Sequence, residues 1–129
     1  MGKVVQLDLP VPPSINNYYV RGHGRSVIVG KKGRDYRASV VAALRPLGLR
    51  VSGCLDVSIV YCAASTSSRA LKDLDNLLKC LLDSLTHAGL WADDFLIDRL
   101  LVERGPITPP GFVSVTVREL DGTSKETKT

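Results

Sequence analysis

The sequence predicts a single small α/β domain, and three observations support this. The chain has 129 residues and a mass of 14.0 kDa, which is enough for one compact domain with its own core. The segment Cys54–Ala63 alternates with a period of two, as a strand in a sheet does, and two other segments carry apolar residues at helical spacing. Hydrophobic residues make up 44% of the chain, which excludes wholesale disorder.

The composition also narrows the class of protein. No apolar run approaches the roughly 18 residues that cross a bilayer, and the N-terminus lacks the apolar stretch of a secretory signal. We therefore expect a cytoplasmic protein that has no membrane partner. The three cysteines Cys54, Cys62 and Cys80 lack CxxC spacing, which argues against a disulfide framework and a thiolate zinc site. We expect them to be half-buried or core thiols.

The N-terminal half alternates short strands with polar loops before one helix. Val4–Leu9 is expected to be a strand that ends at the prolines of residues 10–13. Residues 14–25 are polar and predict a loop, and Ser26–Val29 predicts a short strand bounded by glycines. Apolar residues recur at helical spacing over Arg34–Leu44, which predicts a basic amphipathic helix that ends at the proline and glycine after it.

The second half predicts a strand, a helix and a returning strand. The strand Cys54–Ala63 is followed by a polar loop up to residue 72. A helix then begins after Asp73 at the N-cap and ends before Gly89 at the C′ position. Its leucines form one core-facing stripe: Leu74, Leu77, Leu78, Leu81 and Leu85. Trp91 lies in the turn that returns the chain toward the sheet.

Charge is distributed unevenly along the chain. Between residues 21 and 50 there is one acid, Asp35, against eight basic residues: Arg21, Arg25, Lys31, Lys32, Arg34, Arg37, Arg45 and Arg50. Between residues 73 and 98 there is one basic residue, Lys79, against six acids: Asp73, Asp75, Asp83, Asp93, Asp94 and Asp98. A basic surface beside an acidic cluster suits an enzyme that acts on nucleic acid through a metal ion. Two solvated faces that keep the protein soluble are the alternative.

The acids at the start of the second helix have structural interpretations too. Asp73 is a favoured N-cap residue, and Asp75 with Lys79 is an ordinary i,i+4 pair. The second acidic cluster, which contains Asp94, makes a functional interpretation stronger. Asp94 reaches Asp75 if the following turn or strand runs back beside the helix, or if a second subunit brings its own copy. The sequence leaves both arrangements open.

Three motifs in order give the chain a resemblance to a known family. They are PPSINNYY at 12–19, DLDNLLK at 73–79 and GLWADD at 89–94. The chain resembles the RusA-type Holliday junction resolvases, which carry PPSxNxxYY, D-x-D-N-x-x-K and GxWxDD motifs in this order. The resemblance covers most of the chain. It implies an α/β fold with a mixed β-sheet packed with helices, a homodimer, magnesium dependence and symmetric nicking of four-way DNA junctions.

The resemblance also implies site residues. By motif position the catalytic residues are Asp73, Asp75, Lys79 and Asp94. The expected domain spans residues 1–120, and residues 121–129 are expected to form a disordered polar tail. Family members can carry a run of arginines before the first aspartate, whereas this chain has only Arg69 and Lys72 charged there, which weakens the expected grip of this loop on DNA. The expected DNA-binding residues are Arg21, Arg25, Lys31, Lys32, Arg34, Arg37, Arg69 and Lys72.

Chemical reasoning about phosphodiester hydrolysis gives these residues roles. Mg²⁺ prefers hard oxygen ligands, so Asp73, Asp75 and Asp94 are the expected ligands, and Mn²⁺ is expected to substitute. Lys79 would lie near the scissile phosphate. Asn76 would either position a metal-bound water, which we favour, or simply cap the helix. The other acids of this region, Asp83 and Asp98, are expected to be solvated. We keep two alternative functions: a metal-dependent nuclease for other branched DNA, and a non-catalytic DNA-binding module.

Overall fold

The structure is a computed structural model that describes residues 2–67 and 73–120. Residue 1, residues 68–72 and the tail at 121–129 lie outside the described residues. The expected DNA-binding residues Arg69 and Lys72 are therefore outside them as well.

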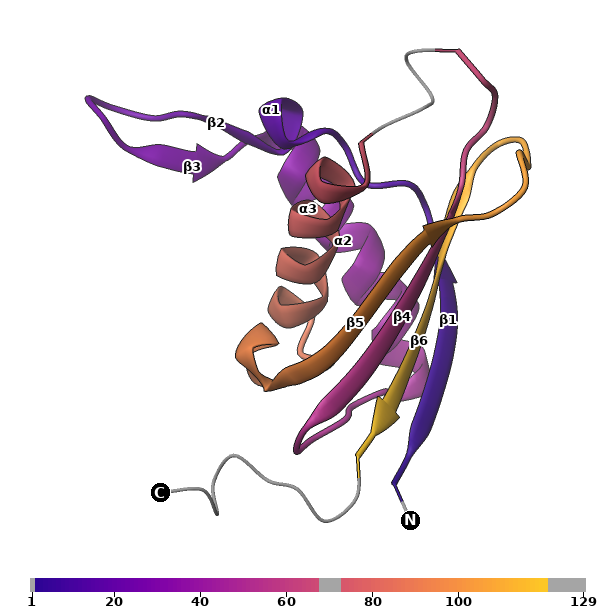
Figure 1. The fold of residues 1–129 in the computed structure, drawn as a ribbon. Coiled ribbons are helices and arrows are strands. Elements are labelled where there is room, and N and C mark those ends of the chain that lie inside the picture. Colours follow the sequence, from indigo (N-terminus) through magenta and orange to yellow (C-terminus); the bar gives the residue numbers. More distant parts are fainter. Residues whose placement is uncertain (1, 68–72, 121–129) are drawn as a thin grey trace.

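A four-stranded mixed sheet forms one layer of the molecule (Figure 1). Its strands are β1 (Val4–Leu9), β6 (Phe112–Glu119), β4 (Leu55–Cys62) and β5 (Ile97–Arg104), in that spatial order. β1 and β4 both pair antiparallel with β6, whereas β4 and β5 are parallel. A parallel pair needs a crossover connection, which here contains the helix α3 (Leu74–His87). The predicted mixed α/β fold is confirmed.

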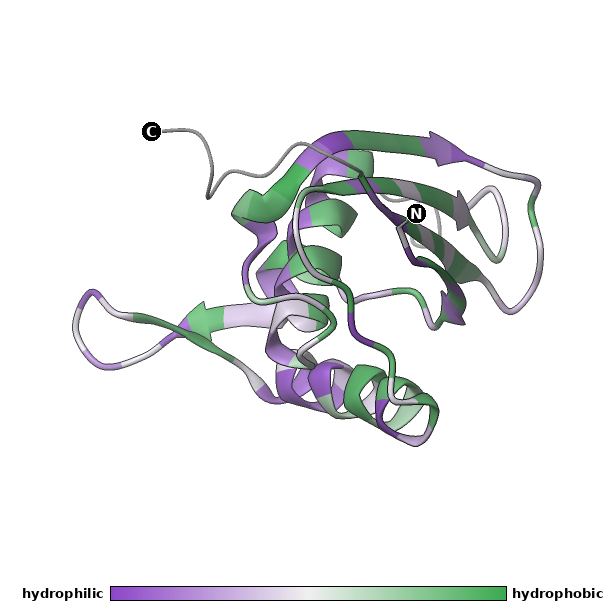
Figure 2. Cartoon of the chain, turned by 90° about the horizontal axis from the view of Figure 1, so that it is seen from below, coloured by the Kyte–Doolittle hydropathy of each residue, from purple (hydrophilic) through white to green (hydrophobic). Residues whose placement is uncertain are grey.

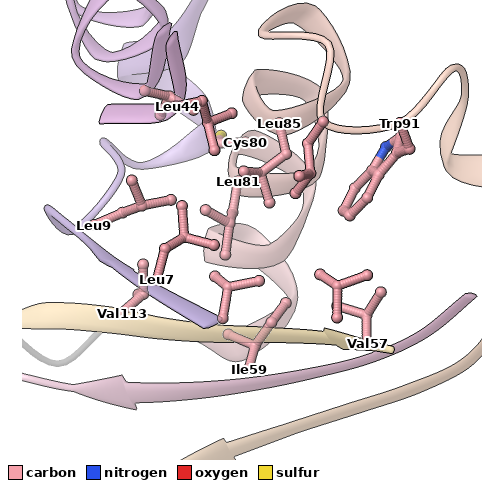
Figure 3. Close-up of a cluster of buried hydrophobic side chains, with 14 of the residues drawn as sticks. Leu7, Leu9, Leu44, Val57, Ile59, Cys80, Leu81, Leu85, Trp91 and Val113 are labelled. Carbon is pink, nitrogen blue, oxygen red and sulfur yellow. The ribbon is translucent and has the colours of Figure 1, made fainter. Parts of the chain in front are cut away.

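The core lies between this sheet and a layer of two helices, α2 (Lys31–Leu44) and α3. In the sheet, Leu7 pairs with Val115, which pairs with Ile59, so that buried side chains form a row across three strands. Figure 3 shows Leu7, Ile59 and other sheet side chains facing Leu81 and its neighbours on α3. The predicted leucine stripe is confirmed, because its members are buried or packed against the core.

The opposite face of the sheet carries small polar side chains. The row next to the buried one runs from Gln6 through Thr116 to Ser58, and none of these three residues is buried. Antiparallel strands commonly keep one polar face in this way. The alternation predicted for Val4–Leu9 and Cys54–Ala63 is therefore confirmed.

The segment predicted as a polar loop is more ordered than expected. It contains a helical turn, α1 (Ile15–Tyr18), and a strand, β2 (Tyr19–Arg21), which pairs with β3 (Val27–Val29). This β2–β3 hairpin projects from the rest of the molecule in both views (Figures 1 and 2). The short strand predicted over Ser26–Val29 is confirmed as β3. The strand β2 was missed because three residues are too few to show a period.

The helix α2 starts three residues before the predicted start, at Lys31. Gly33, expected to bound the preceding strand, lies inside this helix. A Cβ atom at Gly33 would lie 2.5 Å from the carbonyl oxygen of Tyr18, so a glycine lets α2 pack directly against α1.

Other expectations about the chain are also settled by the structure. All three cysteines are buried, which agrees with the prediction of core thiols. Gly89 adopts φ +84° just after α3, which confirms the predicted helix end.

A 3₁₀ turn, η1 (Arg45–Leu47), follows α2, and another, η2 (Asp94–Leu96), precedes β5. Within the described residues, no helix has the length and apolar character needed to span a membrane.

Candidate active site

The first turns of α3 carry four of the predicted site residues. Asp73 occupies the N-cap in an extended conformation, as predicted, but its side chain makes no capping hydrogen bond. Asp73, Asp75 and Lys79 are exposed and Asn76 is half-buried. This exposure follows from the buried stripe, since the fully buried Leu77 fixes which side of α3 faces the core. The carboxylates of Asp73 and Asp75 therefore point out of the core, where a ligand can reach them.

Asp94 lies in η2, and the neighbouring residues fix this turn. The carboxylate of Asp93 accepts a hydrogen bond from the backbone N–H of Phe95 at 3.3 Å. On the N-terminal side, Trp91 is buried and its Nε1 donates to Thr86 Oγ1 at 2.6 Å. These contacts fold the turn back against the end of α3, as Figure 1 shows.

Asp94 interacts electrostatically with two residues of α3, Lys79 and Asp83. Partial burial raises the pKa of Asp94, and the hydrogen bond and charge of Asp93 raise it further, while the Lys79 ammonium lowers it. Partial burial also raises the pKa of Asp83, and the charge on Asp94 adds to this rise. Asp94, Asp83 and Lys79 thus lie within electrostatic reach of one another.

Asp83 corrects an expectation from the sequence. We expected it to be solvated, but its side chain is 30% exposed and its Oδ2 lies 3.8 Å from Lys79 Nζ. It was missed because its neighbour Asp94 comes from a separate element, η2. The i,i+4 spacing from Lys79 was the signal that could have indicated the pairing.

One chain does not bring the three predicted metal ligands together. Asp75 lies one helical turn before Lys79, and Asp83 one turn after it, so Asp75 and Asp83 are about 12 Å apart along the axis. Asp94 lies near Asp83, and in Figure 1 η2 lies at the opposite end of α3 from its first turn. Among residues 2–67 and 73–120, no group of three or more His, Cys, Asp or Glu side chains is placed to hold a metal.

The surroundings of Lys79 connect α3 with the N-terminal motif. Its ammonium lies 5.4 Å from the centroid of the Tyr19 ring. Both residues line a cavity of about 580 Å³ together with residues of α1 and of the β2–β3 hairpin, including Asn16 and Arg21. A cation-bearing cavity of this kind leaves room for a phosphate-containing strand beside Lys79.

The predicted DNA-binding residues fall into two groups. Arg21, Arg25, Lys31 and Lys32 are exposed on the hairpin and at the start of α2, although Lys31 forms an ion pair with Asp35 at 2.8 Å.

Arg34 and Arg37 have structural contacts within the chain. Arg34 donates from NH1 to the carbonyl of Val29 at 2.9 Å. Arg37 donates from Nε to the Tyr18 hydroxyl at 2.7 Å, and its NH1 lies 3.4 Å from His87 Nδ1. Arg34 is exposed and Arg37 is half-buried, but because both side chains are engaged within the chain, we expect Arg21, Arg25 and Lys32 to be freer to contact DNA.

Comparison with known proteins adds to this geometry. A crossover junction endodeoxyribonuclease rusA from Enterobacteria phage HK97 is 40% identical over 116 residues, which span 90% of this chain and 95% of that protein. A crossover junction endodeoxyribonuclease RusA from Escherichia coli O139:H28 (strain E24377A / ETEC) is 36% identical over 88% of this chain and 93% of that protein. The protein of the same name from Escherichia coli (strain K12) is 35% identical over 88% of this chain and 93% of that protein. Residues 9–118 match the family described as Endodeoxyribonuclease RusA, and the chain therefore belongs to that family.

Proposed function

We propose that this protein is a magnesium-dependent endonuclease that resolves four-way DNA junctions by paired, symmetric nicks. The observation that carries the proposal is the match to crossover junction endodeoxyribonucleases over about 90% of the chain. The matched region of this chain contains all four residues of the expected catalytic set, Asp73, Asp75, Lys79 and Asp94. This substrate would put the protein in the cytoplasm with the DNA.

The carboxylates fit a hard divalent cation. Asp73 and Asp75 are exposed, and no hydrogen bond or ion pair joins either side chain to another side chain of the described residues. Carboxylate oxygens of this kind are the ligands that Mg²⁺ prefers, and Mn²⁺ accepts the same set. Asp73, Asp75 and Asp94 would hold the ion, which supplies an activated water and neutralises charge on the scissile phosphate.

The other side chains act on the substrate directly. Lys79 would bind the scissile phosphate and stabilise the charge that develops on it. Asn76 would orient the attacking water from its place behind Asp75. Arg21 and Arg25 on the hairpin would bind flanking phosphates, which gives affinity without sequence information.

Two copies of the chain would complete this chemistry. Asp75 lies in the first turn of α3, whereas η2, which begins at Asp94, lies at the other end of this helix in Figure 1. We therefore favour a site in which Asp73 and Asp75 of one copy meet Asp94 of a second copy. A twofold homodimer would form two such sites. A four-way junction requires two cuts at symmetry-related points, and the same dimer supplies them.

Labelled DNA of different shapes tests the proposed function. The protein should cut a four-way junction with Mg²⁺ or Mn²⁺ and leave it intact in EDTA, while linear duplex is cut much less. Equal cutting of three-way junctions or flaps would favour a nuclease for other branched DNA. Binding without any cutting would favour a non-catalytic DNA-binding module and would overturn the proposal.

A further inference from the structure

The position of the Lys79 ammonium is not fixed by its own helix. Lysine has a long flexible side chain with high rotamer freedom, and the side chain of Lys79 is 57% exposed. Its direction therefore depends on what it touches. On one side lies Asp83, with the charged atoms 3.8 Å apart; on another lies the ring of Tyr19.

Of these two contacts, the ring is the more effective at holding the ammonium. The Asp83 pair is long, at 3.8 Å, and its Lys79 end is 57% exposed to solvent, and such pairs contribute little. The ammonium lies 5.4 Å from the Tyr19 centroid, inside the roughly 6 Å range over which an aromatic face attracts a cation.

The Tyr19 ring itself rests on a firmly held neighbour. The rings of Tyr18 and Tyr19 are 4.7 Å apart at an angle of 57°, a tilted geometry that aromatic pairs favour. Tyr18 is fully buried. Its hydroxyl is hydrogen-bonded to Ser84 Oγ at 2.9 Å and accepts from Arg37 Nε at 2.7 Å. Tyr18 is thus hydrogen-bonded to both α2 and α3, and the ring of Tyr19 packs against the ring of Tyr18.

The hydroxyl of Tyr19 has no comparable role. It is buried and has no hydrogen-bond partner among the described residues. A buried hydroxyl without a partner is destabilising, so the useful part of Tyr19 is its ring. The ring also lines the cavity of about 580 Å³ that opens beside Lys79, where the substrate strand would approach the ammonium.

We propose that Tyr19 is a positioning residue that holds the ammonium of Lys79 toward the scissile phosphate, with Tyr18 as its anchor. This inference rests on the proposed function, because it assigns Lys79 to the reacting phosphate. It also gives the PPSINNYY segment a mechanical role, because the helical turn α1 and its C-cap carry Tyr18 and Tyr19 to the middle of α3.

Spectroscopy without substrate tests the contact. A methylene group above an aromatic face is shifted upfield by the ring current, so the ε-methylene signal of Lys79 should be upfield of the other lysines. Tyr19→Phe keeps the ring and should keep this shift, whereas Tyr19→Leu should abolish it. An ε-methylene signal that is the same in wild type and Tyr19→Leu would overturn the inference.

Single-turnover cleavage of a four-way junction tests the consequence. Tyr19→Leu should slow cleavage roughly five- to tenfold, since the ammonium loses its position, while the dissociation constant for the junction stays the same. Tyr19→Phe, which keeps the ring, should cleave at the wild-type rate. An undiminished rate in Tyr19→Leu would overturn the inference and leave the proposed function intact.

A double-mutant cycle separates positioning from a general structural effect. In a Lys79→Met background, Tyr19→Leu should cause no further loss, because the group that it positions is gone. An equal loss in both backgrounds would overturn the inference. If the wild type cuts no branched DNA, the proposed function fails, and the Lys79 ring-current shift alone decides whether Tyr19 holds the ammonium.

Discussion

At the scale of single residues, the candidate site consists of carboxylates on two separate elements, with Asp73 and Asp75 at the start of α3 and Asp94 in η2. Asp73 and Asp75 were placed correctly at the start of α3, because the N-cap preference and the leucine stripe are local signals. The proximity of Asp83 to Asp94 depends on how η2 folds against α3. That tertiary contact has no local signal in the sequence.

Replacing one proposed metal ligand should separate catalysis from binding. Asp75→Asn keeps the side-chain shape and removes a charged ligand, so cleavage should fall by orders of magnitude. Junction binding measured by gel shift should persist or tighten, because a negative charge near the DNA is lost. Asp8→Asn, an exposed acid on β1, makes the same charge change away from the site and should leave cleavage unchanged. Cleavage by Asp75→Asn at the wild-type rate would exclude Asp75 from the site.

At the scale of elements, long periodic segments were predictable, and of the short ones β3 was predictable from the run Ser26–Val29 whereas α1 and β2 were not. The ends and buried face of α3 agree with the sequence because caps and periodicity act together over 14 residues. The hairpin strands of three residues carry no such pattern. The strand β6 was not predicted, although its alternating Val113, Val115 and Val117 are the signal that could have indicated it.

The β2–β3 hairpin should contribute to DNA affinity through charge alone. Removing both hairpin charges, Arg21→Ala with Arg25→Ala, should weaken binding to every DNA shape. It should reduce the slope of log K against log salt by about 1.8, since each lost phosphate contact removes about 0.9. Arg118→Ala, an exposed residue on the open face of the sheet, is the control and should leave the slope unchanged. An unchanged slope in the hairpin variant would place the DNA surface elsewhere.

The end of β6 holds the start of the chain through one carboxylate. Glu119 accepts hydrogen bonds from the backbone N–H groups of Lys3 at 3.0 Å and Ser52 at 2.9 Å. These bonds hold the pKa of Glu119 below its ordinary value. Because the pKa of Glu119 is lower in the folded state than in the unfolded state, its carboxylate stabilises the fold at pH values above the unfolded-state pKa. This stabilisation is lost as the pH falls through the folded-state pKa.

Thermal unfolding measured over a series of pH values tests this contribution of Glu119 to stability. Glu119→Gln should lower the stability at neutral pH by about 1 kcal/mol or less, because solvent screens the site. The difference in Tm from wild type should shrink below about pH 4, where the wild-type carboxylate becomes protonated. Glu103→Gln on the edge strand β5 is a matched control. A Tm difference that does not change with pH would contradict the charge-based account.

At the scale of the whole molecule, the proposed function depends on how two copies of the chain combine. One chain presents Asp73 and Asp75 at one end of α3 and Asp94 at the other, and the sequence left open whether a second subunit supplies the missing ligand. In the proposed dimer a second copy would supply Asp94, because β5 leads away from η2 to pair with β4, and η2, which begins at Asp94, lies at the far end of α3 in Figure 1. An isologous dimer then gives two equivalent sites from one interface.

Mixing two inactive variants, Asp75→Asn and Asp94→Asn, tests this arrangement most directly. In a mixed dimer with shared sites, one site carries both changes and the other carries neither. Each variant alone should fail to cut a labelled four-way junction in Mg²⁺, and the mixture should restore single nicks with few resolved duplexes. If the mixture stays as inactive as the separate variants, while wild-type dimers cut the same junction, then Asp75 and Asp94 do not act together across two copies.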